Sequence, residues 1–170
     1  MKYVNKFVWL AVLFAGSSSA AELALNVEIP RLNVAEYHKP YVGIWIENSR
    51  RQATQVAVWY DVEMANQEGE EWLKDMRQWW RRGGRALELP VDGLSGATRG
   101  PGVHQLQTEL TDAIKNLPEG EYTLRIEAAR EVGGRELLSL TFSLPLETNE
   151  FPIQARGNSE LGLATLNLSE

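Results

Sequence analysis

The chain has 170 residues, of which 44% are apolar and 24% charged, so it is long and apolar enough to bury the core of one domain. Its 23 acidic residues outnumber its 17 basic ones, and the formal net charge of −6 argues against a nucleic-acid partner, which requires a basic face. The absence of cysteine excludes disulfides, iron–sulfur ligation, attached c-type haem and thiol catalysis. With only His38 and His104 available, a metal site built from several imidazoles is not expected.

The first 21 residues have the pattern of an export signal. Lys2 and Lys6 flank a basic start, the apolar run 7–15 follows, and small residues precede a cleavage point after Ala20 or Ala21. The run is shorter than the roughly 20 residues that span a bilayer, and no later stretch approaches that length. We therefore expect a signal peptide at 1–21, a periplasmic mature domain at 22–170, and no membrane span after cleavage. A retained N-terminal anchor helix is the alternative.

Alternation of apolar and polar residues predicts a strand early in the mature chain, at 23–29. Runs of β-branched and aromatic residues predict two more, at 41–47 and 55–60. The polar stretch 48–54 has the length of a hairpin connection. A helix is expected at 70–82, because acidic residues open this segment, arginines close it and two glycines follow.

The second half of the chain contains further short segments of the same kind, separated by turn residues. Extended segments are expected at 86–91, 103–110, 120–130, 136–145 and 161–168, with loops at 92–102 and 147–157. About seven short strands at this spacing predict a mainly-β fold. We expect an immunoglobulin- or fibronectin-like β-sandwich that carries one inserted α-helix.

The glycine-rich loop contains the heptad Asp92-Gly93-Leu94-Ser95-Gly96-Ala97-Thr98. Its glycines permit backbone conformations closed to other residues, and Ala97 adds little bulk beside the Thr98 hydroxyl. From these residues alone, the heptad is a mobile polar loop that displays one hydroxyl to a modifying enzyme. Asp92 and Ser95 would either hold the loop or face that enzyme. The alternative is an ordinary glycine-rich surface loop.

The heptad resembles the Asp-x-x-Ser/Thr-Gly-Ala-Thr/Ser signature of covalently flavinylated bacterial electron carriers. Every specified position is matched, by Asp92, Ser95, Gly96, Ala97 and Thr98. In those proteins a FAD:protein FMN transferase moves FMN from FAD onto the last hydroxyl residue as a phosphoester. The resemblance therefore implies covalent FMN on Thr98. It covers seven residues, and the rest of the chain does not look like the FMN-binding subunits of sodium- or proton-linked electron-transport complexes.

Most of the mature chain resembles a predicted periplasmic family, domain of unknown function 2271. The resemblance rests on 41–45, 58–60, 79–81, 92–102 and 120–131. One departure is that residues 107–112 lack the Trp-Asp-Gly-x-Asp stretch that often follows the loop in that family. The resemblance implies a partner of the PepSY-like transmembrane reductase kind, and an electron carrier rather than a stand-alone enzyme.

Tryptophans form a stripe in the expected helix. Helical spacing places Trp72, Met76, Trp79 and Trp80 on one face, with Leu73 at its edge. This stripe packs the helix onto the sandwich, or one indole, Trp79 or Trp80, lies against the flavin and contributes on the order of 1 kcal/mol. Both interpretations can hold together, because two adjacent helical tryptophans point in different directions.

The basic residues concentrate at Arg77, Arg81, Arg82, Arg85 and Arg99. Because a phosphodiester on the heptad carries negative charge, Arg99, next in sequence, is the first choice as its partner. For Arg77 and Arg82 the preferred roles are complementing the helix dipole and facing solvent.

The other polar residues carry weaker signals. His38 precedes a strand and His104 follows the heptad loop, and each is either structural or exposed, or close to the flavin. The charged residues of the expected hairpin are interpreted as its solvent face, namely Arg125, Glu127, Arg130 and Glu131. No Ser–His–Asp set or carboxylate pair indicates a hydrolytic site.

The sequence therefore predicts a periplasmic electron carrier with FMN attached to Thr98. One alternative is a non-redox exported β-sandwich binding or accessory module, in which 92–102 only contacts a partner. Another is a sugar-binding sandwich that uses exposed tryptophans.

Overall fold

The computed structural model describes residues 22–169, so the expected signal peptide at 1–21 lies outside the described residues. The strands are β1 (Glu22–Ile29), β2 (Tyr41–Asn48), β3 (Ala53–Tyr60), β4 (Ser95–Ala97), β5 (Gly102–Leu106), β6 (Gly120–Ala129), β7 (Arg135–Leu144), β8 (Ile153–Arg156) and β9 (Leu163–Ser169). The α-helices are α1 (Arg77–Arg81) and α2 (Thr108–Ile114), and the 3₁₀ helices are η1 (Ala65–Asp75), η2 (Gly84–Ala86) and η3 (Thr148–Glu150). Within the described residues, none of the helices combines the length and apolar character needed to cross a membrane.

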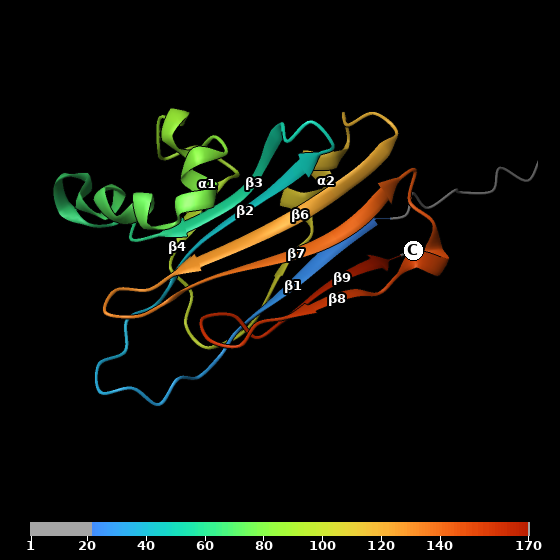
Figure 1. Ribbon diagram of the computed structural model, residues 1–170. Coiled ribbons are helices and arrows are strands. Elements are labelled where there is room, and N and C mark those ends of the chain that lie inside the picture. The colour runs from blue at the N-terminus through green and yellow to red at the C-terminus, as the bar shows by residue number, and fades with distance from the viewer. Residues whose placement is uncertain (1–21, 170) are drawn as a thin grey trace, which may run out of the picture.

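The strands form two sheets stacked as layers (Figure 1). One sheet has the order β5-β1-β9-β8 and the other β4-β3-β2-β6-β7. Neighbouring strands are antiparallel except β3 and β4, which run parallel. This arrangement confirms the expected mainly-β sandwich.

The main core lies between the two sheets, where alternate side chains of each strand point inward. In β6 these are Tyr122, Leu124 and Ile126, and from the facing sheet Leu25 and Leu166 meet them in the same cluster. The leucines and the isoleucine are fully buried. Burial of each such side chain contributes about 1.5–3 kcal/mol to stability.

A second apolar layer covers the outer face of the five-stranded sheet. Leu73 of η1, Trp79 of α1 and Met76 between them pack onto outward-facing side chains of β2 and β3, including Trp45. Figure 1 shows this helical segment lying over those two strands. Gly43 makes room for it, because a Cβ there would lie 2.5 Å from Cγ of Trp79. Strand β2 is therefore buried on both faces.

The continuous helix expected at 70–82 is wrong in its form. The helical segment starts earlier, as η1, and the α-helix begins only at Arg77 after a non-helical Met76 (φ −76°, ψ 73°). The buried residues Leu73, Met76 and Trp79 follow one another at intervals of three. Of the three, Leu73 lies in η1, Met76 in the non-helical junction and Trp79 in α1, so the residues buried on the sheet belong to no single helix.

Three other expectations are corrected in the second half of the chain. Residues 86–91 form no strand, and the end of the expected extended segment 103–110 begins α2, whose Leu110 is buried in the core. Strand β8 lies in the expected loop at 147–157. It is an edge strand with one neighbour and shows half-buried residues at alternate positions, so its sequence signal is weak.

Candidate functional site

The end of the heptad is a strand rather than a mobile loop. Residues Ser95–Ala97 form β4, which adds to the edge of β3 in parallel register with Tyr60 opposite Ala97. The next amide, of Thr98, continues the ladder by donating to the Tyr60 carbonyl at 3.1 Å. Because parallel strands have their carboxyl ends at the same edge, Thr98 lies beside Asp61, the residue that follows β3.

The first half of the heptad forms the turn that leads into β4. The Ser95 hydroxyl accepts the Val91 N–H at 3.0 Å, and the Ser95 amide donates to the Val91 carbonyl at 2.9 Å. Gly93 has φ 73°, a conformation that favours glycine. Ser95 therefore holds the turn, as one of the two sequence interpretations proposed, while Asp92 and Ala97 are exposed.

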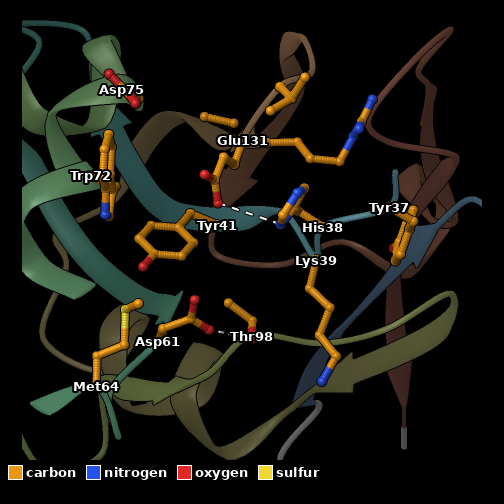
Figure 2. A pocket seen from close by; sticks show the side chains of 13 residues that line it. Tyr37, His38, Lys39, Tyr41, Asp61, Met64, Trp72, Asp75, Thr98 and Glu131 are labelled. Atoms are coloured by element: carbon orange, nitrogen blue, oxygen red, sulfur yellow. Dashed lines mark hydrogen bonds and ion pairs between the residues drawn. The ribbon is translucent and has the colours of Figure 1, made fainter. Parts of the chain in front are cut away.

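The Thr98 hydroxyl donates a hydrogen bond of 2.9 Å to Oδ1 of Asp61. Both side chains line a cleft of about 480 Å³. Its walls come from the segment before β2, the start of β2, the end of β3, η1, the residue after β4 and the turn between β6 and β7. In Figure 2 Asp61 and Thr98 lie between Trp72 and Tyr41 on one side and His38 and Lys39 on the other.

Apolar side chains form much of the rim of this cleft. Met64, Trp72 and Val132 are 44%, 48% and 79% exposed. The ring of Tyr41 is buried beside them. Large apolar side chains gathered around a concave site are typical of a surface that binds a ligand or partner.

The charged lining of the cleft is mixed. Lys39 is an exposed cation, and His38 lies between two carboxylates, with Nδ1 at 3.4 Å from Glu131 and Nε2 at 3.1 Å from Glu36. Burial raises the pKa of Tyr41 to about 12, and the neighbouring Asp61 carboxylate adds to the rise. The Tyr41 hydroxyl therefore keeps its proton at neutral pH.

A buried ion pair lies behind the cleft. Arg130 donates to Glu160 through Nε at 2.7 Å and Nη2 at 3.1 Å, and the Gly134 amide donates to Glu160 at 2.7 Å. The two charged side chains are only 6% and 4% exposed. The expectation that Arg130 faces solvent is therefore wrong, because the loop before β9 covers it.

Glu127 is likewise buried rather than solvent-facing. Its Oε2 accepts the amides of Gln78 at 2.8 Å and Trp79 at 2.7 Å, at the start of α1. Burial raises the pKa of Glu127, and these two amides act in the opposite direction. Glu127 therefore connects α1 to β6 by hydrogen bonds. The apolar and polar pattern of β6 gives no sign of this contact. The expected solvent face is retained by Glu131, which is exposed.

The structure does not bring Trp79 and Trp80 to Thr98. Trp79 is fully buried against β2, so it has no face free for a flavin ring, and that expectation is wrong. Trp80 is partly buried beside Trp79, with ring centroids 6.5 Å apart, and does not line the cleft. Trp72 contributes the indole there instead.

Arg99 is adjacent to Thr98 in sequence but lines a different cleft. Its guanidinium carbon lies 4.0 Å from the centroid of the Trp59 ring. Both residues line a smaller cleft of about 250 Å³, which Gly93–Gly96 also line. His104 contacts the same indole edge-on, at 5.9 Å between centroids, and its Nε2 lies 2.8 Å from the Gly100 carbonyl oxygen. Arg99 and His104 therefore pack around Trp59.

Sequence reasoning missed Asp61 and Lys39, and it assigned Trp72 to packing. Asp61 carried one usable signal, because it follows a strongly predicted strand by one residue. Its proximity to Thr98 depends on the parallel pairing of β3 with β4, which has no local signature. Lys39 precedes β2 by two residues and carried no signal of its own.

Comparison with known proteins identifies the family. The model of the family described as predicted periplasmic protein (DUF2271) matches residues 22–163. No curated protein and no solved structure matches the chain. The matched range covers the five-stranded sheet, the strands β1, β5 and β8 of the other sheet, the heptad and the cleft that it borders, and it ends at the first residue of β9. The chain therefore belongs to the DUF2271 family of predicted periplasmic proteins.

Proposed function

We propose that the protein is a periplasmic electron carrier that holds one FMN in phosphoester linkage to Thr98. The observation that carries this proposal is the position of that hydroxyl. It ends a heptad that matches the flavinylation signature, and it lines a cleft of about 480 Å³. This volume lies within the roughly 300–1,000 Å³ typical of pockets for small molecules and cofactors.

The cleft contains the residue types that a flavin needs. Trp72 offers an exposed indole to an isoalloxazine ring, and the exposed side chain of Met64 adds apolar contact. Lys39 supplies a cation in the same cleft, where the phosphoester would place negative charge. Bound FMN supplies the redox chemistry, whereas the protein supplies attachment, orientation and electrostatic environment.

Attachment requires a FAD:protein FMN transferase as partner. In this step Thr98 Oγ1 forms a bond to the phosphorus of the FMN half of FAD. The phosphoanhydride bond breaks, AMP leaves, and the hydroxyl proton passes to a base. The electron donor that we propose is a PepSY-like transmembrane reductase, because an exported carrier without a substrate of its own needs a source of electrons at the membrane.

The test is co-expression with the FMN transferase of the same genome. The wild-type protein should give a fluorescent band that survives denaturing electrophoresis and a mass increase of one FMN minus water. Thr98→Ala should lose the band, because a phosphoester needs an oxygen nucleophile, and Thr98→Ser should retain part of it. Thr141→Ala, at an exposed threonine of β7, is the matched control and should label normally.

An unlabelled wild-type protein would contradict the proposal. It would favour the binding or accessory module, with the same cleft taking its ligand without a covalent bond. The sugar-binding alternative needs exposed tryptophans, but Trp45, Trp59 and Trp79 are buried. In the described part of the chain, Trp72 has the most exposed indole.

A further inference from the structure

We infer that Asp61 is the base for flavinylation, supplied by the acceptor protein itself, which orients the Thr98 hydroxyl and receives its proton. The inference rests on the proposed function and adds to it a residue outside the heptad. Asp61 lies at the end of β3, far from the heptad in sequence, and only the parallel pairing with β4 places it there.

The hydrogen bond defines the orientation of the nucleophile. A threonine hydroxyl has one hydrogen and two lone pairs. Because Thr98 donates its hydrogen to Oδ1 of Asp61 at 2.9 Å, its lone pairs point elsewhere, and the side chain borders an open cleft. The distance lies within the range of about 2.6–3.2 Å required of a general base.

Two polar side chains of the cleft, and the one carboxylate of the heptad, are less suited to accept this proton. Tyr41 keeps its own proton at neutral pH, since its pKa is about 12. His38 is paired with Glu131 and Glu36 at 3.4 Å and 3.1 Å. Asp92, the only carboxylate of the heptad, is exposed in the turn that precedes β4 and does not line the cleft.

The proposed step balances without a further reactant. FAD supplies the FMN phosphoryl group, Thr98 Oγ1 forms the new P–O bond, AMP leaves with the electron pair of the broken anhydride bond, and Asp61 takes the proton. A positioned base of this kind contributes about 10²–10⁴-fold to a rate. No electron is transferred in the attachment step.

The test measures the initial rate of FMN attachment in vitro, with purified transferase and saturating FAD, as a function of acceptor concentration. Asp61→Asn keeps an oxygen that can accept the Thr98 hydrogen bond but cannot take the proton. We expect its kcat for labelling to fall by about 10²-fold or more while its KM stays within about twofold of wild type. Asp112→Asn, at an exposed carboxylate that does not line this cleft, is the matched control and should label at the wild-type rate.

A second variant guards against an effect on folding. Asp61→Gly should regain part of its labelling rate when formate is added, because a small carboxylate can occupy the space and take the proton. Asp112→Gly should not respond to formate. A purely structural role of Asp61 predicts no rescue.

Each outcome decides one question. Labelling of Asp61→Asn at the wild-type kcat, or a change confined to KM, overturns the inference and leaves the proposed function intact. Failure of rescue in a folded Asp61→Gly, judged by its circular dichroism, also overturns it. An unlabelled wild-type protein overturns the proposed function itself.

Discussion

The heptad separates two clefts that differ in construction. On the Thr98 side the cleft is about 480 Å³ and has an exposed apolar rim that includes Trp72. On the Arg99 side it is about 250 Å³, and the guanidinium packs on the Trp59 ring at 4.0 Å. Successive residues of an extended chain point to opposite sides, so neighbours in sequence serve different surfaces. One side leaves a hydroxyl accessible, whereas the other fastens the edge strand to the sandwich.

The supports of the two clefts also differ. On the Trp72 side, η1 forms one wall of the cleft and leads into α1. The segment is held on the sheet by apolar burial and by the hydrogen bonds from two α1 amides to Glu127. The Arg99 side rests directly on β3 and α2, whose apolar residues belong to the main core. The cleft on the Thr98 side thus depends on an added segment, while the cleft on the Arg99 side depends on the sandwich itself.

The largest effect that separates the two sides is expected from flavin fluorescence. In the labelled protein, Trp72→Leu should raise the fluorescence of the attached flavin several-fold, because an indole stacked on the ring quenches it. Trp80→Leu is the matched control, since Trp80 lies outside the cleft, and it should change the signal little. Equal fluorescence in wild type and Trp72→Leu would place the ring away from Trp72.

The next largest effect is expected on the stability of the helical segment η1–α1 beside the cleft. Glu127→Ala should lower the free energy of unfolding by about 2–4 kcal/mol, because the Gln78 and Trp79 amides at the start of α1 would lose their acceptor. The measurement is urea unfolding followed by tryptophan fluorescence. Glu131→Ala, at an exposed carboxylate just beyond β6, should change it by no more than about 0.5 kcal/mol.

A second variant, Glu127→Gln, tests how the free energy of unfolding depends on pH. Burial raises the pKa of Glu127, so the folded protein binds this proton more tightly than the unfolded chain. The contribution of Glu127 to stability therefore declines as pH rises from the unfolded pKa through the folded one. Glu127→Gln should remove this part of the decline. An unchanged pH dependence would mean that the buried carboxylate does not titrate as its environment indicates.

The smallest effect is expected on the packed side. Arg99→Ala should cost about 1 kcal/mol of stability through loss of the contact with Trp59, while labelling of Thr98 continues. Arg85→Ala removes an exposed arginine and controls for the change in net charge. Loss of labelling in Arg99→Ala with normal labelling in Arg85→Ala would return Arg99 to the role of phosphate partner.

Local periodicity was sufficient for much of the fold. Alternation in 23–29, 120–130 and 136–145 predicted β1, β6 and β7, because the two faces of a strand are encoded by adjacent residues. Runs of β-branched and aromatic residues in 41–47 and 55–60 predicted β2 and β3. The sandwich followed from the number and spacing of such segments. The heptad and its hydroxyl were also found from sequence, since a short motif is visible without knowledge of its neighbours.

Tertiary structure alone decided what covers each face and which residues meet. Glu127 was assigned to solvent because its alternation is correct for an outward face. That face is instead covered by α1, whose two amides that bind Glu127 come from 49 and 48 residues earlier. Arg130 is buried by a partner 30 residues later, and Thr98 meets Asp61 across 37 residues. Period-two and period-three patterns state which residues share a face. They carry no information about the distant segment that packs on that face, because its choice depends on the free energy of the whole assembled fold.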